Sequence, residues 1–388
     1  MAAPAPTIFL IATEESGDRL GASLMRELRA RLGVGVRFEG VGGRAMAEAG
    51  LVSRFPIEEL SIIGLAAVVR QLRGILRRIR ETADAVVAAA PDVLIIIDSP
   101  DFTHRVAKRV CARAPGIPII DYVSPSVWAW RPGRARKMRG YIDHVLAILP
   151  FEPEALRKLD GPPCTFVGHP LTEQIDSLRP NPVEQARRDA SPPILLVLPG
   201  SRRAEIGHHM AVFGETLGRL QAQGVPFEAV LPTMPHLENA VARGLENWPV
   251  RPRVVVGEEA KRAAFRLAHA ALAKSGTVTL ELALARVPMV TAYRGGAVEA
   301  WIVRRYITAS SVILANLVIG ENVIPEFLQE NCTASKLAPA LRDVLTETPM
   351  RRRQQAAFAR IDDIMSTGAR SPSARAADAV LALLRGRA

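Results

Sequence analysis

The chain has 388 residues, more than one hydrophobic core normally organises, so we expect two domains. Its 48% hydrophobic and 23% charged residues are those of an ordinary folded protein. The 50 Lys and Arg residues exceed the 39 Asp and Glu residues, and the net charge of +11 favours an anionic partner such as a nucleotide or a phospholipid surface. Aromatic residues make up only 5% of the chain and do not interleave with the basic ones, which argues against nucleic acid.

The cysteines and the apolar runs indicate the compartment. Cys111, Cys164 and Cys332 lie far apart and form no CxxC pair, which argues against a disulfide framework and against a structural zinc site. No apolar run approaches the ~20 residues that a membrane-spanning helix needs, and the first residues lack the basic start of a signal peptide. We therefore expect a cytoplasmic protein.

Apolar strand patterns alternate with helical patterns along the chain. This alternation predicts an α/β protein with two doubly wound, Rossmann-like domains facing a cleft. The expected strands are Thr7–Ala12, Arg37–Val41, Val93–Ile97, Ile117–Val123 and His144–Leu149, then Ile194–Leu198, Phe227–Leu231, Arg253–Val256, Ala270–Ala273 and Pro288–Tyr293. We expect an N-terminal domain over 1–170, a polar, proline-punctuated linker over 171–192 and a C-terminal domain over 193–388. As an alternative, the C-terminal helices pack back on the N-terminal domain.

This architecture suits a nucleotide-sugar enzyme or a dehydrogenase. A dehydrogenase needs a GxGxxG motif at a strand-to-helix turn, and the glycines around Gly40–Gly43 have the wrong spacing. The seven histidines include no pair with metal-ligand spacing. We therefore expect a site that needs neither a metal nor another cofactor.

Two segments of the first half have the composition of binding loops. Asp98 directly follows the apolar strand Val93–Ile97, at the end where open α/β sheets place ligands. The segment Tyr122–Arg131 follows the next strand and contains two tryptophans and one proline, with Pro132 directly after it, an unusual composition for a loop that binds nothing. An aspartate in this position is also often the N-cap of the next helix, and for Asp98 taken alone that is the better interpretation.

Three strand-to-helix turns have the residues of anion or substrate sites. Helix N-termini offer free N–H groups to an anion, and arginine adds bidentate phosphate contacts. A carboxylate one helical turn on can reach sugar hydroxyls. Each motif is also consistent with an ordinary capped helix. The candidate residues are Ser16, Gly17 and Asp18 in the first turn, Ser201 and Arg202 in the second, and Ser275, Gly276, Thr277 and Glu281 in the third.

The segment Ile62–Ile79 has the pattern of an amphipathic helix with basic residues beside its apolar stripe. Such a helix can lie in an anionic membrane interface, although packing on the sheet is the commoner arrangement and the two uses could divide along its length. The residues expected to meet a membrane or acyl chains are Ile62, Ile63, Leu65, Val68, Val69 and Leu72, with Arg70, Arg73 and Arg77.

Taken together, these motifs resemble the lipid-A-disaccharide synthases, bacterial glycosyltransferases of family 19 with the GT-B fold. The resemblance covers nearly the whole chain, and the run Val123–Arg131 is close to diagnostic. The chain departs from the family pattern at Thr13, Thr103 and Ala315, where glycine, asparagine and proline are usual. The other matching motifs are Glu14–Asp18, Asp98–Phe102, Leu149–Glu152, Val167–Pro170, Leu198–Glu205, Ser275–Glu281, Asn316 and Pro325-Glu326.

The resemblance implies an inverting, metal-independent transfer of 2,3-diacylglucosamine from UDP-2,3-diacylglucosamine to 2,3-diacylglucosamine 1-phosphate. The products are a β-1,6-linked lipid A disaccharide 1-phosphate and UDP, made in lipopolysaccharide biosynthesis at the inner face of the cytoplasmic membrane of a Gram-negative bacterium. A homodimer is a further expectation. Two alternatives stay open: a UDP-N-acetylglucosamine 2-epimerase-like enzyme, and a non-catalytic protein that binds a nucleotide sugar and a membrane.

On this interpretation the first half binds the acceptor and the second half binds UDP. We expect Asp98 to be the general base, with Asp101 in reserve, because an inverting transfer needs a group that removes the proton of the attacking hydroxyl. Arg202 is expected to stabilise the charge that develops on the leaving UDP. Ser275–Thr277 are expected to hold the diphosphate and Glu281 the ribose, and Asn316 joins this donor site by resemblance.

Overall fold

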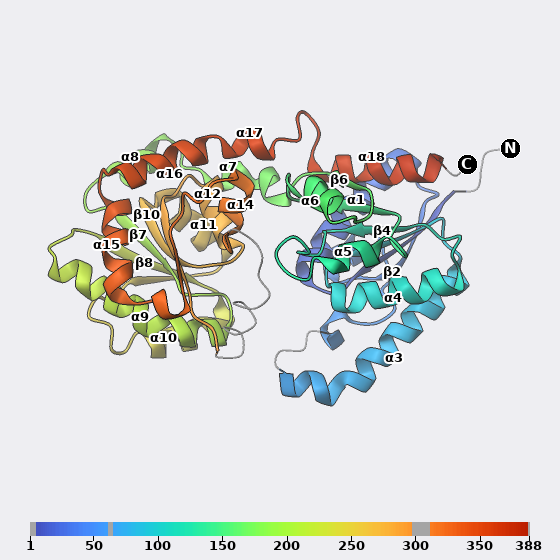
Figure 1. Ribbon diagram of the computed structural model, residues 1–388, viewed down its shortest axis with the longest axis horizontal. Helices are drawn as coiled ribbons and strands as arrows, with labels where there is room; N and C mark the ends of the chain where they lie inside the picture. Colours follow the sequence, from blue (N-terminus) through green and yellow to red (C-terminus); the bar gives the residue numbers. More distant parts are fainter. Residues whose placement is uncertain (1–4, 61–64, 297–310, 387–388) are drawn as a thin grey trace. The chain divides into compact units, whose positions relative to one another are not determined.

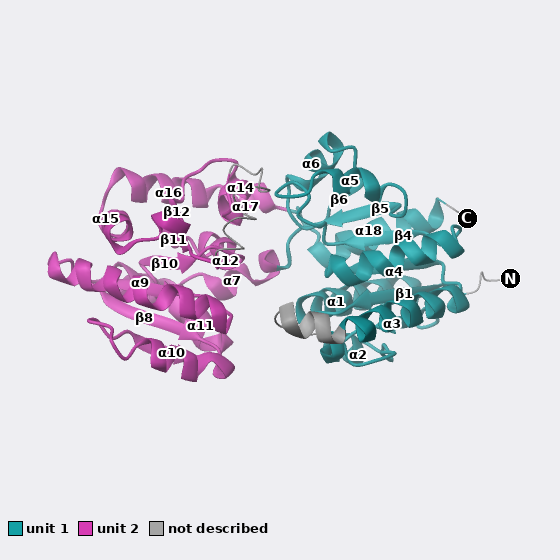
Figure 2. Ribbon diagram, turned by 60° about the horizontal axis from the view of Figure 1, so that its bottom comes forward, with its two compact units in different colours: residues 1–170, 367–388 teal, residues 171–366 magenta. Residues whose placement is uncertain are grey.

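The computed structural model divides into two compact units (Figures 1 and 2). It describes residues 5–60, 65–296 and 311–386, with side chains in the helix after residue 64 described from residue 72 onward. Unit 1 comprises residues 1–170 and 367–388, and unit 2 comprises residues 171–366. Each unit is built around its own parallel sheet.

Unit 1 contains a six-stranded parallel sheet in the order β2-β1-β3-β4-β5-β6. Its central strands are continuous apolar runs because helices cover both faces of the sheet, and every residue of β1 and β3 is buried. The strands are β1 (Thr7–Ala12), β2 (Arg37–Val41), β3 (Val93–Ile97), β4 (Ile119–Tyr122), β5 (His144–Ala147) and β6 (Cys164–Phe166).

Helices cover the two faces of this sheet with separate apolar clusters. Helices α1, α2 and α18 pack on the face that receives Ile8 and Leu10, whereas α3, α4, α5 and α6 pack on the face of Phe9 and Ile11 (Figure 1). The helices are α1 (Glu15–Leu32), α2 (Arg44–Glu48), α3 (Leu65–Ala89), α4 (Pro100–Arg113), α5 (Gly133–Met138), α6 (Glu152–Lys158) and α18 (Pro372–Arg385), with a 3-10 turn at Ile57–Leu60.

The strand order of unit 1 reverses between β1 and β3. The chain goes from β1 to its neighbour β2 on one side and then crosses to β3 on the other side. The loops that leave β1 and β3 therefore separate at their carboxyl ends, which is where open α/β sheets form a ligand crevice. Glu14 follows β1 and Asp98 follows β3, so both lie at this switch point.

Unit 2 repeats the plan with a six-stranded parallel sheet in the order β12-β11-β10-β7-β8-β9. Its switch point lies between β7 and β10, which pair from Ala270↔Leu195 to Ala273↔Leu198. The turn after β7 holds Ser201 and Arg202, and the turn after β10 holds Ser275–Thr277. The strands are β7 (Ile194–Leu198), β8 (Glu228–Thr233), β9 (Arg253–Val256), β10 (Ala270–Lys274), β11 (Met289–Tyr293) and β12 (Glu326–Leu328).

Helices α9 and α15 pack on one face of the second sheet, and α11 and α12 also contact its strands. The longer helices are α8 (Pro182–Asp189), α9 (Arg203–Ala222), α11 (Glu258–Leu267), α15 (Ala334–Leu345) and α16 (Pro349–Ala359). The shorter ones are α7 (Ile175–Leu178), α10 (Glu238–Gly244), α12 (Val278–Leu284), α14 (Leu314–Ile319) and α17 (Ile361–Met365), with 3-10 turns at Pro170–Gln174, Pro235–Leu237 and Gln329–Asn331.

The ten expected strands are all present, half of them with the expected bounds. The sequence pattern did not predict β6 and β12, because a strand of three residues at a sheet edge is too short to show a period. The expected linker 171–192 forms α7 and α8 and belongs to unit 2. The last helix, α18, packs in unit 1, where Arg375 Nη2 donates to the carbonyl of Phe166 at 3.0 Å.

Candidate functional site

The loop after β3 has a strained backbone. Asp98 and Ser99 both have positive φ, 53° and 46°, a conformation that costs non-glycine residues about 1–3 kcal/mol each. Three contacts hold it. The Asp98 N–H donates to the carbonyl of Tyr122 at 3.0 Å. The Thr103 hydroxyl donates to the carbonyl of Asp98 at 2.7 Å and to that of Ser99 at 3.1 Å. Since this strain is stored at a switch point, we interpret the loop as functional.

The carboxylate of Asp98 is half-buried and does not cap helix α4. Its Oδ1 accepts the N–H of Ser99 at 2.7 Å, whereas the first-turn N–H groups of α4 receive no side-chain cap. The N-cap interpretation of Asp98 is therefore wrong. Asp101, the reserve candidate for the base, lies exposed in the first turn of this helix.

Burial and neighbouring charges adjust the acidity of Asp98. Burial raises the pKa of its carboxyl above the ordinary value, and the charges of Glu14 and Asp121 raise it further against the opposing bond from Ser99. Glu14 is held at this place because its Oε1 accepts the hydroxyl of Ser99 at 3.0 Å. A carboxylate with a raised pKa is a better proton acceptor than an ordinary aspartate.

The Tyr122–Arg131 segment is anchored by a buried glutamate. Glu152, with 2% of its surface exposed, accepts the indole N–H of Trp128 at 3.2 Å and the N–H of Leu149 at 3.0 Å. The Trp128 ring also meets Phe151 edge to face at 5.0 Å. Burial raises the pKa of Glu152 to about 7. The motif Leu149–Glu152 by itself predicts no role for this glutamate.

A second buried polar group lies beneath the loops. His104 Nε2 lies 3.1 Å from Asp121 Oδ2, and His104 Nδ1 hydrogen-bonds the Tyr141 hydroxyl at 3.0 Å. All three residues are buried. Sequence reasoning missed this group because a lone acidic residue inside an apolar strand has no recognisable spacing.

In the turn after β1, the residues expected to contact substrate have structural roles instead. Asp18 is buried, and its carboxylate accepts the N–H groups of Gly43, Ala45 and Met46 at 2.7, 2.8 and 3.1 Å. It therefore caps α2 rather than its own helix. Gly17 lies buried against β3, and Ser16 is exposed at the start of α1.

The turn after β7 places one exposed arginine beside a paired lysine. Gly200 has φ 140°, and a Cβ there would lie 2.5 Å from Glu205. Glu205 accepts the Ser201 N–H at 2.9 Å, and Lys274 Nζ lies 3.0 Å from it. Burial would raise the pKa of Glu205, but Lys274, Ser201 and Arg202 lower it overall. Arg202 is 76% exposed and lies 3.5 Å from the same carboxylate.

The turn after β10 is short and has its own ion pair. Ser275 is buried and donates to the carbonyl of Val312 at 3.2 Å, while Thr277 is exposed at the N-cap of the seven-residue helix α12. Gly276 lies between them, where a Cβ would come within 3.3 Å of Lys274 Nζ. Glu281 Oε2 accepts a hydrogen bond from Lys261 Nζ at 2.6 Å. A ribose contact would therefore compete with Lys261 or use the other oxygen.

Two further buried polar residues hydrogen-bond the backbone of neighbouring segments in unit 2. His209 is buried, and its Nε2 accepts the N–H of Arg294 at 2.9 Å, so its Nδ1 donates to the carbonyl of Glu205 at 2.7 Å. Asn316 is also buried, and its amide bonds the backbone of Val323 and Ile324 at 3.0–3.2 Å. The expected substrate contact of Asn316 is corrected by this geometry, because the chain itself occupies the amide.

Comparisons with known proteins decide the family. The family model for lipid-A-disaccharide synthetase matches residues 8–380. A lipid-A-disaccharide synthase of Rhodopseudomonas palustris (strain BisB18) is 76% identical over 377 residues, covering 97% of this chain and 95% of that protein. One from Bradyrhizobium diazoefficiens is 71% identical, covering 98% and 97%. The chain belongs to the lipid-A-disaccharide synthase family. It is thus a glycosyltransferase of lipid A biosynthesis.

Solved structures show that this lipid-A-disaccharide synthase family member has the GT-B fold. The UDP complex of MnaA from S. aureus matches with a TM-score of 0.62 at 11% identity, covering 98% of this chain and 97% of that one. The UDP-GlcNAc 2-epimerase of Neisseria meningitidis bound to UDP-GlcNAc matches equally well, covering 98% and 99%. At this identity the likeness is one of fold alone, so the epimerase alternative gains no support from it.

The expected amphipathic helix corresponds to α3 of this synthase family member. Its C-terminal part packs in the core, where Ile79, expected on the apolar stripe, is buried. Further towards the N-terminus, Leu72 and Leu76 are 43% and 39% exposed, and Arg73 and Arg77 are exposed beside them. The C-terminal part of α3 therefore packs in the core, whereas the part around Leu72 and Leu76 faces solvent. The expected contacts at Ile62 and Ile63, and the side chains of Leu65, Val68, Val69 and Arg70, lie outside the described residues.

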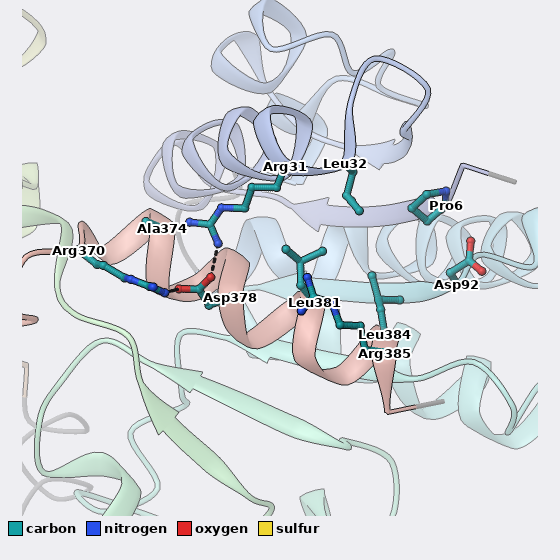
Figure 3. A pocket seen from close by; sticks show the side chains of 10 residues that line it. All are labelled: Pro6, Arg31, Leu32, Asp92, Arg370, Ala374, Asp378, Leu381, Leu384 and Arg385. Atoms are coloured by element: carbon teal, nitrogen blue, oxygen red, sulfur yellow. Dashed lines mark hydrogen bonds and ion pairs between the residues drawn. The ribbon is translucent and has the colours of Figure 1, made fainter. Parts of the chain in front are cut away.

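A cavity of about 670 Å³ in unit 1 lies at the amino ends of the strands, opposite the end that carries Asp98 (Figure 3). Pro6 and Asp92, which line it, precede β1 and β3. Two of its arginines, Arg31 and Arg370, both pair with Asp378 of α18. Ligands of open α/β sheets bind at the carboxyl edge, so we do not assign substrate to this cavity.

The described residues hold no cluster of three or more His, Cys, Asp or Glu side chains that could bind a metal ion. Nor does any helix among them have the length and apolarity needed to cross a membrane.

Replacing Asp18 with alanine separates a structural role from a substrate contact in this synthase family member. The variant leaves three N–H groups of the α2 N-terminus without an acceptor, so we expect a loss of about 3 kcal/mol in unfolding free energy, seen as a lower Tm. The KM values for both substrates should stay unchanged. Glu15→Ala is the control, because Glu15 is exposed one helical turn before Arg19, with which it pairs at 3.4 Å. An Asp18→Ala enzyme with the wild-type Tm but weaker substrate binding would contradict the assignment.

Proposed function

We propose that the chain transfers 2,3-diacylglucosamine from its UDP donor to the 6-hydroxyl of 2,3-diacylglucosamine 1-phosphate, with Asp98 as the general base and without a metal ion. Membership of the lipid-A-disaccharide synthase family supports the pair of substrates. The observation that carries the proposal is the strained turn that holds a half-buried carboxylate at the switch point of unit 1.

The chemistry follows from inversion. Asp98 removes the proton of the 6-hydroxyl as its oxygen attacks the anomeric carbon of the donor from the face opposite UDP. The new C–O bond forms while the bond from the anomeric carbon to the diphosphate oxygen breaks, and its electron pair leaves with UDP. Asp98 suits this step because its Oδ1 is held by the Ser99 N–H and no cation is among the groups that shift its pKa.

The negative charge that develops on UDP needs a cation or fixed donors in unit 2. Lys274 and Lys261 are each paired with a glutamate, at 3.0 and 2.6 Å. Arg202 is more exposed and has a looser contact with Glu205. We therefore assign the leaving-group charge to Arg202, the diphosphate to the turn Ser275–Thr277 and the ribose to Glu281.

We also propose that the N-terminal part of α3 meets a membrane surface. Its exposed leucines and arginines are the two components of an interfacial helix, an apolar face and cations for anionic headgroups. Both proposed substrates carry acyl chains, so an enzyme that acts on them benefits from a position at the inner face of the cytoplasmic membrane.

The base assignment predicts a pH effect in Asp98→Asn. Asparagine keeps the shape and can still accept the Ser99 N–H, but it cannot accept a proton. We expect kcat to fall by roughly 10²–10⁴-fold with little change in UDP affinity. A base must be deprotonated, so the wild-type rate should fall as pH drops through the pKa of Asp98, at a higher pH than for an ordinary aspartate because that pKa is raised. The variant should lack this acidic limb.

The control for Asp98→Asn is Asp101→Asn, which makes the same charge change three residues away on an exposed side chain. UDP release from the diacylated donor, with and without acceptor, measures both variants. A large loss in Asp101→Asn with a near wild-type rate in Asp98→Asn would move the base to Asp101. If neither change affects UDP release, carboxylate catalysis at this loop is excluded.

Arg202→Ala should lower kcat much more than it weakens UDP binding, because the charge on UDP grows in the transition state. Arg203→Ala is the matched control. Arg203 follows directly in sequence but is the first residue of α9 and lines the groove between α9 and α10. Turnover and calorimetric UDP affinity give the comparison. Equal losses in kcat and in UDP affinity for Arg202→Ala would mean that Arg202 only anchors the ground state.

Replacing Arg73 and Arg77 with glutamine should reduce binding to vesicles that contain anionic lipid, and high salt should reduce wild-type binding in the same way. Arg136→Gln with Arg139→Gln removes the same charge from exposed arginines that pair with Asp160, and should have little effect. Vesicle sedimentation measures the bound fraction. Unchanged sedimentation of the α3 variant would assign this helix to protein packing alone.

A further inference from the structure

Arg131, at the end of the tryptophan-rich loop, has no role in the proposed transfer so far. It is exposed, it has φ 56°, and its guanidinium lies 4.3 Å from the ring centroid of Trp130, which is itself 37% exposed. Among the described residues, Arg131 has no carboxylate partner within ion-pair distance. Stacking on an aromatic ring fixes the plane of a guanidinium while its N–H groups stay available for an anion.

Arg134 lies one turn further and connects this loop to the general base. Its Nη2 donates to the carbonyl of Pro100 at 3.1 Å, two residues after Asp98. Its backbone N–H donates to the carbonyl of Arg131 at 2.9 Å. The two arginines are therefore neighbours, and one of them contacts the loop that carries Asp98.

The neighbouring arginines on the same segment are arranged differently. Arg136 and Arg139 point to Asp160 and pair with it at 2.9 and 3.2 Å. Their charges are neutralised within the protein, whereas those of Arg131 and Arg134 are not matched by a carboxylate among the described residues. An excess of positive charge at this edge of the sheet favours an anionic ligand.

The loop is also rigidly supported, as a binding loop should be. The bond between Trp128 and the buried Glu152, with the edge-to-face contact to Phe151, fixes it two residues before Trp130. The buried Glu152 thus restrains the part of the loop that leads directly to Trp130 and Arg131. Such preorganisation reduces the entropy that binding would otherwise cost.

We infer that Arg131 and Arg134 bind the phosphate group of the sugar acceptor. This inference rests on the proposed function, which places the acceptor hydroxyl at Asp98. In a glucosamine 1-phosphate, the carbon that bears the 6-hydroxymethyl group and the phosphate-bearing carbon lie on either side of the ring oxygen. The attacking hydroxyl and the phosphate therefore lie along one edge of the sugar. A cation that contacts the Asp98 loop is in the right place to hold that phosphate.

The test pairs each arginine variant with an acceptor that lacks the phosphate. We measure kcat/KM of wild type, Arg131→Ala and Arg134→Ala with 2,3-diacylglucosamine 1-phosphate and with 2,3-diacylglucosamine. A guanidinium bound to phosphate contributes about 10- to 100-fold, the size of a charge-assisted hydrogen bond. We expect Arg131→Ala to lose this factor with the phosphorylated acceptor and almost nothing with the other. Arg134→Ala should lose more with the phosphorylated acceptor than without the phosphate.

Arg136→Ala is the matched control, and it should behave like wild type with both acceptors. Equal losses in Arg131→Ala for the two acceptors would show that Arg131 only supports the loop, and would overturn the inference. No loss in Arg131→Ala with either acceptor would overturn it as well. A wild-type enzyme that releases no UDP from the diacylated donor with either acceptor would refute the proposed function instead.

Discussion

The parallel order of each sheet is the constraint on which the rest of this molecule depends. Parallel strands need crossover helices on both faces, so only the strand ends remain open for chemistry. In each unit the strand order reverses once, at β1/β3 and at β7/β10, and the loops that leave these strands separate at that place. The residues that we assign to catalysis and to UDP follow β3, β7 and β10 for this reason.

The acidic groups of unit 1 are electrostatically connected. Asp121 lies buried in β4, and its charge raises the pKa of both Asp98 and Glu152. Like charges in a buried region make each carboxylate hold a proton more tightly. His104 lies beside Asp121, and Glu152 is stabilised by donors from Trp128 and Leu149. The buried Asp121 therefore adjusts the basicity of Asp98, and the buried Glu152 supports the tryptophan-rich loop.

In unit 2 the carboxylates near the switch point form ion pairs with lysine and arginine side chains. Glu205 lies close to Ser201, Arg202 and Lys274, while Glu281 pairs with Lys261. These carboxylates hold Lys274 and Lys261 in place, whereas Arg202 stays largely exposed. In the donor site that we propose, a diphosphate would meet lysines already oriented by these carboxylates, and orientation of charged groups before the reaction is a large electrostatic contribution to catalysis.

The local pattern of the chain determined the strand and helix order, the two Rossmann-like units and the turns at which function is placed, because apolar periodicity and position relative to strand ends are properties of neighbouring residues. Tertiary structure decided which polar side chains in those turns remain available. Asp18 is used by N–H groups 25 to 28 residues away, and Glu152 is used by Trp128, 24 residues away. Such partners meet only when strands pair and helices pack over them. A capped helix and a ligand site can therefore have the same sequence motif, and burial and hydrogen-bond partners in the folded chain distinguish them.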